Sequence, residues 1–311
     1  MSEQPVQETE SSGQVLGIDV GWSELTDTTG ACLLRWTESR VSFDVYHIPT
    51  DYEARKQALR ELVGNHIFNA VALDGPLRLG LDRIDEYRLA ELLLTRRFSN
   101  LGFGKPGQSS SPNGIMLNEH ANQYAKSVIE ADCIKKAEHA AAIHEKAIVE
   151  AFPTTFLAVM LDDGRRPSSK AKSDIFYEWL LGPNAPGRHI PDENRFEELI
   201  SRLLPNRSIE STTGNVTDHE HRAAVICALT ALCVAKRDYV GIGDSRNGYI
   251  ILPPSVEVSK AGLQPWAMSM IRANAKEARR WQRDGLSQSP PAPHVIIEAN
   301  GQVDYFDAEY K

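Results

Sequence analysis

The sequence of 311 residues contains no apolar run that approaches the roughly 20 residues of a membrane-spanning helix. Its cysteines, Cys32, Cys133, Cys227 and Cys233, form no Cys-x-x-Cys pair. Because they lie far apart or in apolar stretches, we expect reduced thiols in the core, as in a cytoplasmic protein. Residues 1–13 are polar and acidic and lack a signal-peptide pattern, so we expect a disordered leader there. These absences predict a cytoplasmic chain with no membrane partner and no disulfide framework.

An excess of basic residues is also absent, since 42 acidic residues outnumber 34 Lys and Arg and give a net charge of −8. Such a chain gains no general electrostatic attraction to nucleic acid, because that attraction depends on basic side chains that neutralise phosphates. A nucleic-acid or nucleotide substrate would therefore have to be held by local basic loops or by bridging metal ions.

Hydrophobic residues make up 41% of the chain, which is enough for a sizeable core. Apolar alternation predicts strands, and apolar residues three or four apart predict helices. The expected elements are strands over 15–20, 29–36 and 41–48, a helix over 52–63, a strand over 70–73 that ends at Asp74, a helix over 85–97, further helix from 119 that closes on a strand-like run at 147–152, helices over 173–181, 196–204 and 217–235, a strand over 248–254, a helix over 265–282, and a hairpin around Asn300-Gly301.

Three sequential strands, a helix, a strand and then further strand–helix alternation fit neither a doubly wound sheet nor a barrel. They predict an α/β fold of RNase H-like type, with a mixed five-stranded sheet in the order 3-2-1-4-5 and helices on both faces. Helical insertions and a C-terminal helix and hairpin elaborate it. We therefore expect one RNase H-like domain over 14–255 and an extension over 256–311.

Three acidic residues stand at the ends of predicted strands. Asp19 ends the first strand, Asp74 ends the fourth, and Glu150 lies in the AIVEAF run. In the expected order the first and fourth strands are neighbours, so Asp19 and Asp74 would be close, and each would raise the other's pKa unless a cation lay between them. Mg²⁺ or Mn²⁺, which prefer oxygen ligands, are the expected ions. Each residue also has a purely structural reading, as a turn residue or an edge-strand charge.

The start of the helix at 217–235 carries the fourth acidic segment, with Asp218 and Glu220 as further candidate ligands and catalytic residues. Acids from several strand ends and one helix start are typical of two-metal phosphoryl transfer. An acid at a helix start is equally natural as an N-cap. His219 and His221 could carry protons or bind metal, but two residues apart they do not share a face, and ordinary surface histidines are the favoured interpretation.

Candidate substrate-binding residues lie in loops rich in Gly, Ser or Pro, where basic side chains could contact phosphates, with solvated loops as the alternative. Trp22, directly after the first strand, could stack on a base, although packing at the sheet edge is the commoner role of such a residue. The basic candidates are Arg96, Arg97, Lys105, Arg165, Arg166, Lys170 and Lys172.

The segments GIDVGW, ALDGPL, VEAFPTTFL and DHEHRAAVICALTAL, followed by GYIILP, resemble in order and spacing the family of unknown function numbered 429, whose members are described as RNase H-like nucleases. The resemblance runs from about Val15 to Pro254. It implies that the family's acidic positions correspond to Asp19, Asp74, Glu150 and the Asp218/Glu220 segment.

This sequence departs from the pattern of related proteins at one of these acidic positions. Related resolvases of RNase H-like fold have an Asp-x-x-Asp-Ala pattern on the last helix, whereas here the comparable stretch is Glu220-His221-Arg222-Ala223. The second acid is missing, so Asp218 or Glu220 must supply the last ligand.

Three functions follow from the sequence. The first is a metal-dependent nuclease that uses clustered carboxylates. The second is an ATP-binding protein of the actin-like and sugar-kinase type, which GIDVGWSELTDTTG fits loosely although ALDGPL lacks a glycine-rich phosphate loop. The third is a binding protein that retains the fold without its chemistry. A homo-oligomer stays open for all three.

Overall fold

The computed structural model describes residues 11–21, 29–49, 51–63, 67–78, 87–99, 109–162, 173–180, 195–210, 216, 218–256, 261–283, 294–299 and 302–307. In this part of the chain, strands of one mixed sheet alternate with helices, so the predicted α/β class is confirmed. None of the described helices is both long enough and apolar enough to cross a bilayer. All four cysteines are buried and free, as predicted.

The described strands form a single ten-stranded sheet in the order β10-β9-β7-β8-β5-β4-β1-β2-β3-β6. The predicted five strands are too few, because one strand adds beside β3 and four add beyond β5. The strands are β1 Gly13–Asp19, β2 Gly30–Trp36, β3 Arg40–His47, β4 Ala70–Asp74, β5 Ile148–Ala151, β6 Ser208–Ile209, β7 Tyr239–Asp244, β8 Gly248–Leu252, β9 His294–Ala299 and β10 Gln302–Asp307.

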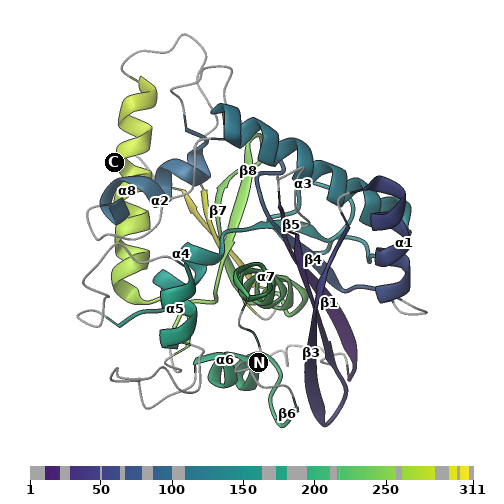
Figure 1. Cartoon of the computed structure of the whole chain (residues 1–311). Helices are drawn as coiled ribbons and strands as arrows, with labels where there is room; N and C mark the ends of the chain where they lie inside the picture. The colour runs from purple at the N-terminus through teal and green to yellow at the C-terminus, as the bar shows by residue number, and fades with distance from the viewer. Residues whose placement is uncertain are drawn as a thin grey trace.

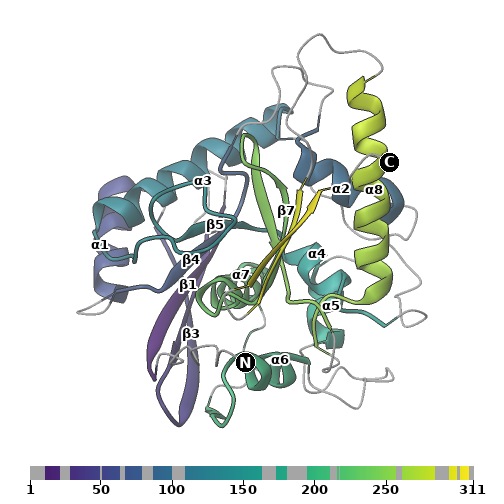
Figure 2. The same ribbon diagram turned by 180° about the vertical axis from the view of Figure 1, so that it is seen from behind.

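Helices cover both faces of the sheet (Figures 1 and 2). They are α1 Tyr52–Val63, α2 Leu89–Ser99, α3 Pro112–Glu130, α4 Pro153–Ala158, α5 Ser173–Leu180, α6 Arg195–Leu203, α7 His219–Ala235 and α8 Pro265–Arg283. Several begin or end within a few residues of the predicted bounds, but α3 begins earlier than 119 and the chain from 131 to 147 is not helical.

Helix α7 packs on β1, β2 and β4 and is apolar along most of its length, as a helix in the core must be. Two glycines allow this close approach. A β-carbon on Gly17 would lie 2.0 Å from the main-chain nitrogen of Ala228, and one on Gly30 would lie 2.4 Å from the carbonyl oxygen of Glu220. The first turn of α7 is therefore held directly over the Asp19 end of the sheet.

The opposite face is covered by α3, with α1 packed against it. Thr29 precedes Gly30 and so points away from α7, and its hydroxyl oxygen accepts a hydrogen bond from the Tyr124 hydroxyl of α3 at 2.8 Å. Gly75, which follows Asp74, likewise lies against Ala121 and Leu117 of α3. The sheet thus separates two environments, one under α7 and one under α3.

The C-terminal strands β9 and β10, yellow in Figure 2, are part of the sheet. The hairpin itself was predicted, but β9 pairs antiparallel with β7, a strand that the sequence pattern did not indicate. Helix α8 packs along α2. The leader at 1–10 and the turn at Asn300-Gly301 lie outside the described residues, and the proposed division at 255/256 stays a prediction.

Candidate metal centre

The register of the sheet aligns four residues in one row across β3, β2, β1 and β4. His47 pairs with Gly30, Gly30 pairs with Asp19, and Asp19 pairs with Asp74. Paired residues point to the same face, and residues two apart on a strand share a face, so the row lies on the side of Gly17 and of α7. The strand pairing therefore places Asp19 beside Asp74, as predicted, and adds His47 two strands away.

Asp19 and Asp74 share a side-chain hydrogen bond, which requires that one of the two carboxyl groups be protonated. Burial, and then the charge of Asp74, raises the pKa of Asp19 well above its ordinary value. Burial, and then the charge of Glu150, raises the pKa of Asp74 to about 7. Two carboxyl groups this close cannot both be ionised in isolation, so one of them keeps its proton near neutral pH.

The start of α7 brings two more carboxylates to this edge. Asp218 is the N-cap of α7, and its Oδ1 accepts hydrogen bonds from the main-chain N–H groups of Glu220 and His221 at 2.9 and 3.2 Å. The charges of Glu220 and Asp218 both raise the pKa of Asp19, so they act on the same site. The N-cap interpretation of Asp218 is thus confirmed, and its place beside Asp19 also keeps it as a candidate ligand.

Glu150 lies near Asp74, and the two residues line one pocket, but its side chain is engaged differently. It pairs with Leu73 rather than with Asp74, so its side chain points to the face opposite α7. There both of its oxygens are bonded to Arg88, at 2.6 and 2.8 Å, and Arg88 also binds Glu91 at 2.7 Å. That Glu150 is a catalytic metal ligand therefore stays a prediction, and a metal ion would have to compete with the buried guanidinium for both of its oxygens.

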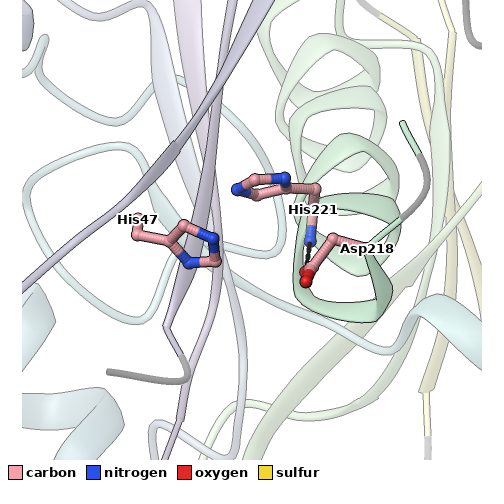
Figure 3. Close-up of side chains that lie close together, drawn as sticks. All are labelled: His47, Asp218 and His221. Atoms are coloured by element: carbon pink, nitrogen blue, oxygen red, sulfur yellow. Dashed lines mark hydrogen bonds between the residues drawn. The ribbon is translucent and has the colours of Figure 1, made fainter. Parts of the chain in front are cut away.

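Three histidines lie near the start of α7. His221, expected to be an ordinary surface residue, is only partly exposed, and its ring lies against that of His47, with centroids 4.3 Å apart and ring planes tilted by 40° (Figure 3). Burial and the neighbouring His47 lower the pKa of His221, which favours a neutral imidazole. His219 is instead exposed, with its Nδ1 2.9 Å from an oxygen of Asp174. Sequence reasoning missed His47, although it stands at a strand end as the acids do.

Most of the predicted substrate-binding residues lie outside the part of the chain that the structure describes. Arg97 is an exception: its side chain binds Asn274 and Glu277 of α8, which gives it a structural role between two helices. The side chain of Arg96 is not described. The remaining candidates lie outside the described residues, namely Trp22, Lys105, Arg165, Arg166, Lys170 and Lys172.

The residues present fit a divalent cation with oxygen ligands. Within the part of the chain that the structure describes, no lysine or arginine forms an ion pair with Asp19 or Asp74. The two carboxyl groups instead share a proton, with Glu220 and Asp218 adding negative charge. A cation between the carboxylates would relieve this repulsion, and carboxylate oxygens are the preferred ligands of Mg²⁺ and Mn²⁺.

The raised pKa of Asp74 predicts how stability depends on pH in the metal-free protein. A carboxyl group whose folded pKa lies above its unfolded value contributes stability at low pH, and this contribution is lost as pH rises. We expect the free energy of unfolding to fall from about pH 4 to about pH 7, the folded pKa of Asp74, by up to about 1.4 kcal/mol per pH unit. Urea unfolding at several pH values, in the presence of a chelator, measures this pH dependence of the free energy of unfolding.

The matched control for this pH series is Asp74→Asn, which removes the titrating group. We expect the variant to lose the part of the slope that Asp74 contributes, while buried Asp19 keeps the rest, and saturating Mg²⁺ to flatten the slope of the wild type by favouring the ionised carboxylates. A variant with the same slope as the wild type would show that Asp74 does not titrate in this range.

Comparisons with models of protein families, with curated proteins and with solved structures returned no match. The chain is therefore described by its structure alone. It is a mixed α/β protein in which acidic and histidine side chains gather at the ends of neighbouring strands.

Proposed function

We propose that this chain is a metal-dependent phosphodiester hydrolase, a nuclease, of RNase H-like type. The observation that carries the proposal is the pairing of Asp19 with Asp74 at the ends of two parallel strands, under the acidic first turn of α7. The contiguous order β3-β2-β1-β4-β5 within the larger sheet supports the RNase H-like assignment.

In this proposal Asp19, Asp74, Glu220 and Asp218 hold Mg²⁺ or Mn²⁺. When bound, the ion would activate water for attack on a phosphodiester and stabilise the leaving oxygen. Asp19 and Asp74 keep their carboxylates side by side because strand pairing fixes both main chains. Asp218 orients the start of α7 through two main-chain hydrogen bonds, which positions Glu220 over Gly30.

The substrate class is nucleic acid or a nucleotide, and the negative net charge favours a small or metal-screened anion over a long duplex. The loops with Lys105, Arg165, Arg166, Lys170 and Lys172 are the proposed phosphate contacts. Arg97 is less suited to this role, because α8 already engages it.

Incubating the purified full chain in Mn²⁺ with RNA, DNA and nucleotide panels tests the proposal. We expect cleavage that a chelator abolishes and that added Mn²⁺ restores. Cleavage of none of these substrates would overturn the enzyme and favour a binding protein. Thermal stabilisation by ATP with Mg²⁺, without hydrolysis of a phosphodiester, would instead favour the ATP-binding alternative.

A further inference from the structure

A second group of metal-ligand side chains lies next to the carboxylates. His47, Asp218 and His221 each offer one ligand atom, and these three atoms lie within 4.8 Å of one another. His47 ends β3, whereas Asp218 and His221 belong to the start of α7, and the two imidazole rings face each other across the gap between strand and helix (Figure 3). The register that aligns His47 with Gly30 and Asp19 brings the histidine under this helix end.

Two of these side chains, those of Asp218 and His221, are held in a way that suits a ligand. The carboxylate of Asp218 is oriented by two main-chain hydrogen bonds, both to its Oδ1. The ring of His221 bonds to the main chain of Tyr46, and its Nε2 is buried without a hydrogen-bond partner among the described residues. A buried polar atom without a partner is costly, and a coordinated cation would satisfy it.

We propose that His47, Asp218 and His221 bind a divalent transition metal, Zn²⁺ in the first instance. Imidazole nitrogen suits such ions, whereas the oxygen-only group around Asp19 and Asp74 suits Mg²⁺ and Mn²⁺. Three protein ligands leave a coordination position open, which is typical of catalytic rather than structural zinc. The site is distinct from the proposed nuclease centre, although the two share Asp218.

The geometry leaves that open position for water or for an oxygen of a bound substrate. His47 is exposed, so one side of the site reaches solvent.

The test is a calorimetric titration of the untagged, chelator-treated full chain with Zn²⁺, with Co²⁺ as a spectroscopic substitute. We expect one Zn²⁺ per chain and a visible Co²⁺ spectrum typical of four-coordinate cobalt. His47→Ala and His221→Ala should each weaken Zn²⁺ binding by at least about 100-fold, because residues that only orient ligands already contribute 10- to 100-fold. His219→Ala is the matched control, since this neighbouring histidine bonds to Asp174, and it should bind Zn²⁺ as the wild type does.

Wild-type affinity in His47→Ala would overturn the inference, as would equal losses in His47→Ala and His219→Ala. His47 is exposed at a strand end, so its replacement leaves the fold intact, and thermal unfolding of each variant verifies this. The two proposals fail separately. Asp19→Asn should keep the Zn²⁺ site while losing Mn²⁺, so Zn²⁺ binding through the histidines without any nuclease activity would leave this inference standing alone.

Discussion

Asp19→Asn is expected to abolish manganese-dependent hydrolysis and to weaken Mn²⁺ binding by more than about 100-fold, because it removes a direct ligand and not merely a residue that orients one. The same holds for Asp74→Asn, its partner across the strand pair. Neither change should unfold the protein. Stability should stay the same or rise slightly, because an amide in place of one carboxylate relieves the repulsion that burial and the neighbouring charge impose in the metal-free site.

The measurement combines Mn²⁺ titration, an activity assay and urea unfolding of each variant. Asp44→Asn is the matched control, since Asp44 is an exposed carboxylate on β3 that pairs with Arg35 at the surface. We expect this control to keep wild-type activity and metal affinity. Full Mn²⁺ affinity in Asp19→Asn and Asp74→Asn alike would contradict the assignment of this pair as ligands.

The second large effect concerns the face opposite α7. We expect Arg88→Met to lower the free energy of unfolding by about 3 to 5 kcal/mol, since removing one partner of a buried ion pair leaves an uncompensated charge. Arg88 and Glu91 are each 1% exposed, and both oxygens of Glu150 bind the same guanidinium. Urea unfolding at neutral pH measures the loss. Adding Glu150→Gln to Arg88→Met should recover part of it.

Arg97→Met is the control for this experiment. Arg97 also binds a glutamate, but its side chain is 40% exposed, so its removal should cost less than about 1 kcal/mol. If Arg88→Met were no more damaging than Arg97→Met, Glu150 would not be fixed by Arg88 and would be available to the carboxylates around Asp19.

Local patterns were sufficient to predict the first four strands and most helices, because alternation and helical spacing reflect burial directly. The four-residue turn TESR also fixes the β2–β3 register, in which Trp36 lies opposite Val41 and Gly30 opposite His47. His47 could therefore have been placed from the sequence. That His47 lies near Asp19 could not be predicted, because it depends on the β1–β2 register, which no short turn determines.

The errors arise where distant residues decide the outcome. Strand β7 contains two glycines in six residues and pairs with β8 and with the C-terminal β9, so its signal depends on partners far along the chain. Asp74 is the last residue of β4, whereas Glu150 stands one residue before the end of β5 and pairs with Leu73. That offset turns Glu150 to the other face, where Arg88 meets it.

The most direct test of the central claim is the anomalous difference map of a crystal soaked in Mn²⁺. The claim is that Asp19 and Asp74, joined by strand pairing under the start of α7, together hold a cation. The account predicts an anomalous peak bonded to oxygens of both carboxylates. A map with no peak there, with the two carboxyl groups still sharing a hydrogen bond in the presence of Mn²⁺, would contradict it.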